Sequence, residues 1–318
     1  MVSDLQSQIS ELNIVCLAGG VGGAKLAEGL SKIVPPERLT VIVNTGDDFQ
    51  HLGLTICPDL DTITYTLGGV ANPQTGWGRL GESWVTVDEV KRLGGPAWFN
   101  LGDFDLAAHL VRSQLLADGE TLTAVTSHLC KQFGIQARVL PMSDQAAPTM
   151  IDTDEGLLPF QIWFVKEQWQ PVVREVRLPP DVKATPQVMH ALEYADFVLF
   201  APSNPFVSID PILQVYPIRE MIMDLPRAVV AVTPIIAGKA VKGPAAKMMA
   251  EMSLPVTAES VARYYGDLID GFVVDQQDAG QLDNLKCEVL ECNTIMGEGP
   301  DRTRLAAEVL RFALQIAG

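Results

Sequence analysis

Residues 14–30 of the chain read IVCLAGGVGGAKLAEGL, an apolar run that leads through a cluster of glycines into a helical pattern. Glycine costs order in a folded chain, so such a cluster usually marks a place where the backbone approaches something closely. A strand, a glycine turn and a helix N-terminus together form an anion-binding unit, because the first helical N–H groups have no partner of their own. This stretch therefore predicts an anion site.

This motif departs from the two common nucleotide-binding fingerprints. Gly20 and Gly22 fit the start of G-x-G-x-x-G, but Lys25 occupies the position of its last glycine. Leu26 stands where the P-loop has Ser or Thr after its lysine. A tight βα turn without a ligand is therefore the alternative interpretation.

The rest of the chain alternates short apolar runs with longer amphipathic ones, which is typical of an α/β fold with βαβ units and a mainly parallel sheet. Several runs are continuously apolar, as expected for strands buried on both faces. The expected strands are 13–18, 39–44, 97–101, 136–141, 196–201, 227–233 and 271–275. Helices are expected near 23–34, 58–68, 86–93, 104–117, 120–133, 186–194, 244–252, 257–266 and 301–317.

Residues 142–183 differ from this alternation. They contain Trp163 and Trp169, several prolines, and alternating stretches such as PFQIWFV and PVVREVRL. Alternation of apolar and polar residues indicates half-buried strands. We therefore expect a single domain over residues 1–318, with 142–183 as a β-rich insertion or lid.

Composition and charge exclude several classes of protein. The 318 residues are 47% hydrophobic and carry a net charge of −16, which argues against a nucleic-acid or acidic-membrane surface, because such binding depends on Lys and Arg. No apolar run approaches the roughly 18 residues that span a membrane, and the N-terminus lacks a basic signal region. The five cysteines form no C-x-x-C pair. These features favour a reduced, cytoplasmic compartment.

Polar blocks follow the expected strands, where an open parallel sheet binds its ligands. NTGDDF contains Asp47 and Asp48, CPDLDT contains Asp59 and Asp61, and LGDFDLAAH contains Asp103. Acidic pairs at one rim repel one another unless a cation sits among them, and Mg²⁺ suits a few carboxylates together with phosphate oxygens. The alternative is that each Asp caps a helix. We favour a Mg²⁺ site.

A second constellation lies on one expected helix. Asp105, His109 and Arg112 are spaced i, i+4 and i+7, so they share a face; the carboxylate could orient the imidazole, and the guanidinium could reach a phosphate. The segment KGPAAK, with Lys242 and Lys247, is a weaker second candidate for an anion site. No nucleophile motif is evident, so positioning, a metal ion and charge stabilisation, as in phosphoryl transfer, are the expected chemistry.

At these residues the chain resembles the 2-phospho-L-lactate transferase family, which makes the phosphodiester of coenzyme F-420. The resemblance rests on AGGVGGAKLAEGL, VNTGDDF, CPDLDTITY, LGDFDLAAH, LPMSD, APSNPFVSIDPI and TPIIAGKAVKGPAAKMM, in this order. It implies a Rossmann-like three-layer α/β/α fold. It also implies a Mg²⁺-dependent enzyme that moves a phospholactate or phosphoenolpyruvate group from a guanosine-diphosphate-activated donor to the ribityl hydroxyl of the deazaflavin Fo, releasing GMP.

The resemblance also implies roles for single residues. Asp61 and Asn100 would contact Fo, while Ser203 and Asn204 would help to hold the guanosine part. The residues that would face the phosphates are Gly19, Gly20, Gly22, Gly23 and Lys25. We expect His109 and Arg112 among the substrate-binding residues. Catalytic roles fall to Asp48, Asp61 and Asp103, and metal binding to Asp47, Asp48 and Asp59. Many members of the family carry basic residues where this chain has Asn100 and Phe104, which leaves the three-carbon acid of the donor open.

Two other functions are possible alternatives for such a sequence. A nucleotide-sugar-binding regulatory protein without turnover would not need so many carboxylates around a negative ligand. An NAD-dependent dehydrogenase is disfavoured, because no acidic residue ends the strand at 39–44, where a ribose-binding carboxylate would sit. The expected partners are Fo and the activated donor, without nucleic acid or membrane, and the expected assembly is a homodimer.

Overall fold

The computed structural model describes residues 2–224, 226–282 and 285–318, and its centre is a seven-stranded sheet. Every neighbouring pair of its strands runs parallel, in the order β14-β13-β10-β9-β1-β2-β5. The strands are β1 (Ile14–Ala18), β2 (Leu39–Val43), β5 (Arg138–Pro141), β9 (Phe197–Phe200), β10 (Ala228–Val232), β13 (Gly271–Asp275) and β14 (Glu288–Cys292). The α/β, mainly parallel fold predicted from the sequence is confirmed.

The order of the strands reverses next to β1. The chain builds outward from β1 through β2 to β5, and then returns to place β9 on the other side of β1. In open α/β sheets this reversal leaves a crevice at the carboxyl ends of the two diverging strands, because their following loops turn to opposite faces. The glycine turn follows β1, so the topology alone places it at that crevice.

The central strands are buried on both faces because their side chains alternate between two cores. Val15 and Leu17 of β1 pack into one core, whereas Ile14 and Cys16 pack into the other. All five residues of β1 are buried. This is why the sequence of the strand is continuously apolar rather than alternating.

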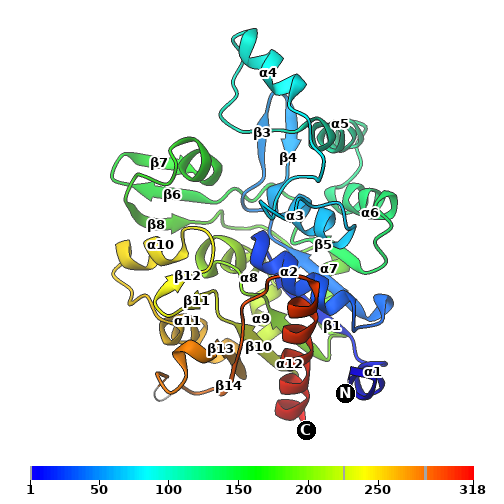
Figure 1. Cartoon of the computed structure of the whole chain (residues 1–318), viewed down its shortest axis with the longest axis vertical. Helices are drawn as coiled ribbons and strands as arrows, with labels where there is room; N and C mark the ends of the chain where they lie inside the picture. Colours follow the sequence, from blue (N-terminus) through cyan, green and yellow to red (C-terminus); the bar gives the residue numbers. More distant parts are fainter. Residues whose placement is uncertain (1, 225, 283–284) are drawn as a thin grey trace.

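Helices cover both faces of the sheet and give three layers (Figure 1). One face carries α1 (Val2–Ile9), α2 (Gly20–Ser31), α3 (Pro58–Leu67), α6 (Leu122–Gln132) and α12 (Gly299–Ala317). The other carries α7 (Pro186–Glu193), α8 (Asp210–Gln214), α9 (Ile218–Asp224), α10 (Ala245–Glu251) and α11 (Ala258–Tyr265). Among the described residues, no helix combines the length and the apolar character that crossing a bilayer requires.

Smaller elements extend from the sheet toward the top of Figure 1. Residues 142–183 contain an antiparallel sheet of three strands, which confirms the predicted β-rich character of this segment. Its action as a lid stays a prediction. The strands are β6 (Met150–Thr153), β7 (Gly156–Pro159) and β8 (Val173–Arg177). The other small elements are the hairpins β3 (Phe49–His51) to β4 (Leu54–Ile56) and β11 (Ile235–Ile236) to β12 (Lys239–Ala240), with α4 (Val85–Arg92) and α5 (Asp103–Ala117).

The strand predicted at 97–101 was wrong. This segment is a loop, and its Trp98 and Phe99 rings pack 5.6 and 4.9 Å from the ring of Phe49, so its apolar residues serve an aromatic cluster instead of the sheet. The sequence analysis also missed β14 and the helices α1, α8 and α9. β14 is an edge strand whose residues are half-buried or exposed, so it lacks the continuous apolar run of the others.

We predict that Gly29→Ala lowers the thermal stability of the protein. A Cβ at Gly29 of α2 would lie 2.1 Å from the carbonyl oxygen of Arg302, so α2 and α12 could no longer pack at their present distance. Overpacking of this kind costs about 1–3 kcal/mol, which lowers the melting midpoint by several degrees. Differential scanning calorimetry checks this. Lys32→Ala at the exposed end of the same helix is the control, and an equal midpoint for wild type and Gly29→Ala would contradict the prediction.

Candidate active site

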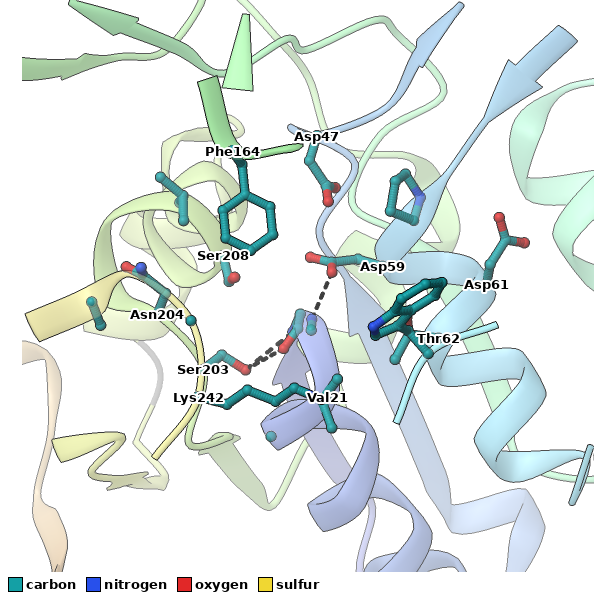
Figure 2. Close-up of a pocket in the computed structure, with 18 of the residues that line it drawn as sticks. Val21, Asp47, Asp59, Asp61, Thr62, Phe164, Ser203, Asn204, Ser208 and Lys242 are labelled. Carbon is teal, nitrogen blue, oxygen red and sulfur yellow. Dashed lines mark hydrogen bonds between the residues drawn. The ribbon is translucent and has the colours of Figure 1, made fainter. Parts of the chain in front are cut away.

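A cleft of about 720 Å³ opens at the carboxyl edge of the central sheet. Its lining includes the segments that follow β1 and β9, so it occupies the crevice at the reversal of strand order. The volume lies in the range of small-molecule and cofactor sites. Figure 2 shows side chains that converge on it. The predicted site residues that line it are Gly19, Gly20, Gly22, Lys25, Asp47, Asp59, Asp61, Asn100, His109, Ser203 and Asn204.

The glycine turn after β1 is held by two side chains from distant segments (Figure 2). Gly20, at φ +61°, donates its N–H to Asp59 Oδ1 at 2.6 Å. Ser203 Oγ donates to the carbonyl of Gly19 at 2.7 Å and accepts the N–H of Gly19 at 3.2 Å. Ser203 therefore shapes the turn, in addition to lining the cleft.

Two more glycines of the turn are required by close packing against the segment that follows β9. A Cβ at Gly22 would lie 2.2 Å from the carbonyl oxygen of Pro202, and one at Gly23 would lie 2.8 Å from Ser203 Oγ. Gly23 does not line the cleft, so its position does not support the predicted contact with a ligand. Gly22 and Gly23 are therefore explained by the close packing of the segments that follow β1 and β9, whether or not an anion binds at the turn.

Asp47 and Asp59 form a buried acidic pair at the cleft. Asn44, which is fully buried, donates Nδ2 to Asp47 Oδ1 at 3.3 Å and to Asp59 Oδ2 at 2.9 Å. Gln161, from the β-rich insertion, donates to Asp47 Oδ2 at 3.1 Å. Burial raises the pKa of Asp59 to about 6, and burial together with the charge of Asp59 raises the pKa of Asp47. Within the described part of the chain, these carboxyls accept hydrogen bonds from neutral donors, which leaves their charge without compensation.

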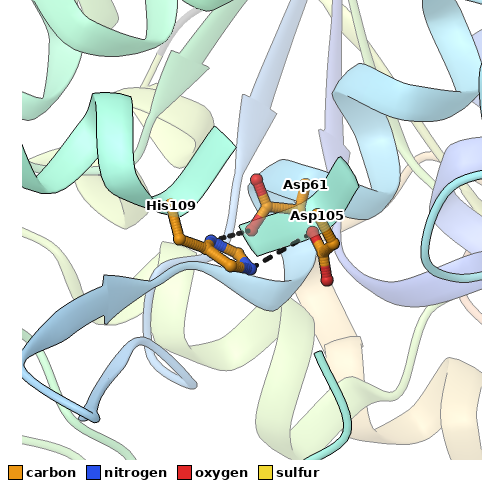
Figure 3. Close-up of side chains that lie close together, drawn as sticks. All are labelled: Asp61, Asp105 and His109. Atoms are coloured by element: carbon orange, nitrogen blue, oxygen red, sulfur yellow. Dashed lines mark ion pairs between the residues drawn. The ribbon is translucent and has the colours of Figure 1, made fainter. Parts of the chain in front are cut away.

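A second acidic cluster surrounds the side chain of Arg112 (Figure 3 shows three of its members). Arg112 is 2% exposed and donates from both terminal nitrogens to the carboxylate of Asp61. Its Nη1 also lies 2.9 Å from His109 Nδ1. Because a guanidinium can only donate, Nδ1 accepts and the ring proton of a neutral His109 is on Nε2, 3.1 Å from Asp105 Oδ1. The hydroxyl of Tyr65 donates to the same oxygen at 2.7 Å.

Two expectations from the sequence concern the residues of this cluster. The i, i+4 spacing does bring Asp105 onto the imidazole of His109. Arg112, however, does not line the cleft and is occupied by Asp61, so it is not free to reach a phosphate as the sequence suggested.

Two acidic groups were tested as sites for a divalent cation. Ligand atoms of Asp61, Asp105 and His109 lie within 4.8 Å of one another, but the guanidinium of Arg112 already supplies a positive charge there. The pair Asp47 and Asp59 offers carboxylate oxygens whose partners are neutral. Oxygen ligands with uncompensated charge fit Mg²⁺, so this pair is the better candidate of the two.

Two predicted catalytic residues lie outside the cleft lining. Asp103 accepts hydrogen bonds from Ser83 Oγ and from the N–H groups of Val85 and Thr86, which lower its pKa to about 2 and fix the start of α4. Burial raises the pKa of Asp48, against the opposing effect of the Cys57 thiol. These positions do not support a catalytic role for Asp103 or Asp48, nor metal binding by Asp48.

The substrate-facing residues include side chains that the sequence analysis did not single out. Phe160, Phe164 and Trp169 of the β-rich insertion line the cleft, and so do Trp77 and Phe99. The rings of Phe160 and Phe164 are stacked, with centroids 5.4 Å apart. The aromatic run PFQIWFV was the available signal, but its ligand-facing members could not be told from core residues without the fold. The cleft therefore joins an apolar aromatic part to an anionic and glycine-rich part.

The comparisons with known proteins agree with this combination. The family model for 2-phospho-L-lactate transferase CofD matches residues 14–296. A phosphoenolpyruvate transferase from Kitasatospora aureofaciens is 43% identical over 316 residues, covering 96% of this chain and 98% of the relative. A 2-phospho-L-lactate transferase from Methanosarcina mazei is 36% identical over 302 residues, covering 93% of this chain and 99% of the relative.

A solved structure supports the fold alone. Protein BH3568 from Bacillus halodurans is 16% identical, with a TM-score of 0.63, and the match covers 95% of this chain and all of that one. Together, fold, cleft and relatives define the class of the protein, which is a transferase with a Rossmann-like fold. More particularly, the chain belongs to the CofD family of 2-phospho-L-lactate transferases.

We predict that Asp59 makes the metal-free protein less stable as the pH rises. Its pKa is raised from 3.8 to about 6 in the folded protein, so folding is penalised increasingly between these values and fully above the higher one. Asp59→Asn removes this titration. The melting midpoint of the variant, measured in EDTA, should therefore fall less between pH 4.5 and pH 7.5 than that of wild type, by a few degrees. Parallel pH profiles for the two proteins would contradict this, and Asp118→Asn, at an exposed carboxyl, is the control.

We also predict that Asp61→Asn destabilises the fold. The substitution leaves the buried guanidinium of Arg112 without its counter-charge, which costs on the order of 3–5 kcal/mol and lowers the melting midpoint by several degrees or more. The matched control is Asp152→Asn, which breaks a pair whose Arg177 side chain is 52% exposed and is worth about 1 kcal/mol or less. Equal midpoints for the two variants would show that the buried pair does not stabilise the fold.

Proposed function

We propose that this enzyme transfers a phosphoenolpyruvyl group from a guanosine-diphosphate-activated donor to the ribityl hydroxyl of the deazaflavin Fo, releasing GMP, in coenzyme F-420 biosynthesis. The observation that carries the proposal is the two-part cleft, in which aromatic side chains meet the glycine turn and the acidic pair. A flat, largely apolar tricycle suits the first part, and a diphosphate suits the second. The choice of the enolpyruvyl group follows the names of the more similar relatives: those at 39–43% identity are phosphoenolpyruvate transferases, whereas relatives of both kinds occur at 36–37%.

The chemistry is a substitution at phosphorus. The oxygen of the Fo hydroxyl forms a bond to the phosphorus that carries the three-carbon acid and releases its proton to the solvent. The bond from that phosphorus to the bridging oxygen breaks, and GMP leaves with this oxygen. Positioning and charge stabilisation supply most of the rate in such reactions. Asp61 is paired with Arg112 and lines the cleft, so its oxygen atoms can accept a hydrogen bond from the attacking hydroxyl and orient it.

In the proposed reaction, Mg²⁺ binds at the acidic pair. Asp47 and Asp59 would hold the ion, and a bound Mg²⁺ would neutralise charge on the phosphate oxygens. Asn44 and Gln161 fix the two carboxyls before any ligand arrives. The Mg²⁺ requirement and the homodimer remain predictions.

The alternative, a nucleotide-sugar-binding protein without turnover, meets a physical difficulty here. Among the described residues, four aspartates line the cleft, namely Asp47, Asp59, Asp61 and Asp105. Each would weaken the binding of an anionic ligand unless its charge is needed for a metal ion or for the orientation of a hydroxyl. A binding protein gains nothing from this arrangement.

We predict that the purified protein, incubated with Fo, Mg²⁺ and the synthetic enolpyruvyl donor, yields GMP and a phosphodiester of Fo that mass spectrometry identifies. The lactyl donor should react as well, and its product should be heavier by two hydrogen atoms. The two donors differ at one trigonal centre, and a binding site discriminates weakly between groups of such similar shape. Binding of both substrates without GMP release would favour the regulatory alternative. A reaction with the lactyl donor alone would overturn the choice of the enolpyruvyl group.

A further inference from the structure

Lys242 reaches across the mouth of the cleft from the loop that follows β12. Its side chain lines the cleft and runs toward Val21 in the first turn of α2 (Figure 2). A Cβ at Gly76 would lie 3.2 Å from Lys242 Nζ and 2.8 Å from Val21 Cγ1, so the ammonium group sits between the 72–79 loop and α2. Lys242 Nζ donates to the carbonyl of Thr75 in that loop.

A second ammonium group lies in the same neighbourhood. Lys25 Nζ donates to the carbonyl of Met296 at 2.6 Å. Burial lowers the pKa of Lys25, and the nearby charges of Arg302 and Lys242 lower it further. Both lysines thus use a neutral backbone carbonyl as their acceptor, while their charges repel each other. Two cations held together in this way at a cleft are stabilised when an anion enters between them.

Two other basic groups near the cleft are paired with carboxylates. Lys247 of the KGPAAK segment donates to both carboxylate oxygens of Glu251, at 2.5 and 2.6 Å. Arg112 is bound to Asp61. Within the described part of the chain, Lys25 and Lys242 are the Lys and Arg side chains that line the cleft, so they are the ones able to offset its four carboxylates when a polyanion binds.

We propose that Lys242 is a donor-binding residue whose ammonium group leaves the Thr75 carbonyl to bind the diphosphate of the activated donor, together with Lys25. The inference rests on the proposed function for the identity of the donor. Lys242 supplies charge at the phosphates, and its exchange of partners frees the 72–79 loop when the donor enters. A charged hydrogen bond of this kind contributes a tenfold or larger gain in affinity.

The test is calorimetric titration of wild type and Lys242→Met with GDP and with guanosine, in the presence of Mg²⁺. We expect the affinity for GDP to fall tenfold or more in the variant, and the affinity for guanosine to stay within about threefold, because only the diphosphate meets the ammonium group. Lys242→Arg should keep most of the affinity for GDP. Lys239→Met, an exposed lysine on the same hairpin, is the matched control and should bind GDP as wild type does.

The outcomes separate this inference from the proposed function. If wild type forms GMP and the Fo product while Lys242→Met binds GDP unchanged, the inference is overturned and the proposed function stands. If Lys242→Met weakens GDP and guanosine equally and has a lower melting midpoint, Lys242 acts through the Thr75 loop alone, which also overturns the inference. If wild type binds no GDP and forms no product, the proposed function fails, and the inference fails with it.

Discussion

The hydrogen bond from the Gly20 N–H to the carboxylate of Asp59 joins the parts on which the site depends. Gly20 belongs to the turn after β1, and Asp59 lies in the first turn of α3. Asn44, after β2, holds the other oxygen of Asp59 and reaches Asp47 as well. A buried carboxyl therefore ties two strand ends and a helix into one frame. Burial disfavours the charged form of Asp59 and raises its pKa, so this arrangement lowers the stability of the fold. The packing of the two cores offsets that loss.

The acidic and the basic side chains that line the cleft are held by different kinds of partner. The carboxylates are held by other side chains: Asp61 pairs with Arg112, and Asp47 accepts hydrogen bonds from Gln161 and Asn44. The ammonium group of Lys25 donates to the carbonyl of Met296, and that of Lys242 donates to the carbonyl of Thr75. In the proposed reaction, the fixed carboxylates would orient the acceptor hydroxyl, and the two lysines would exchange their carbonyl partners for the phosphates of the donor.

Much of the fold followed from local patterns. The continuous apolar runs at 13–18, 39–44 and 196–201 are strands, because burial on both faces of a parallel sheet selects such runs. The pattern failed where burial was incomplete or served another purpose. β14 lies at the edge of the sheet, and its residues are half-buried or exposed. The apolar run at 97–101 packs its aromatic rings against the β3–β4 hairpin. The apolar character of a segment predicts that it is buried. Which element it packs against depends on the segments that lie next to it in the fold.

For the site, the sequence by itself determined which residue types gather at the carboxyl edge, because loops after parallel strands meet there whatever their details. It placed the glycine turn, Asp47, Asp59, Asp61, Ser203 and Asn204 at one cleft before any contact was known. The tertiary structure alone decided which of them face the ligand and which face protein. Asp103 fixes α4, Gly23 packs on Ser203, and Arg112 neutralises Asp61, since side-chain direction and pairing depend on contacts between segments far apart in the chain. Residue type and spacing carry no information about those distances.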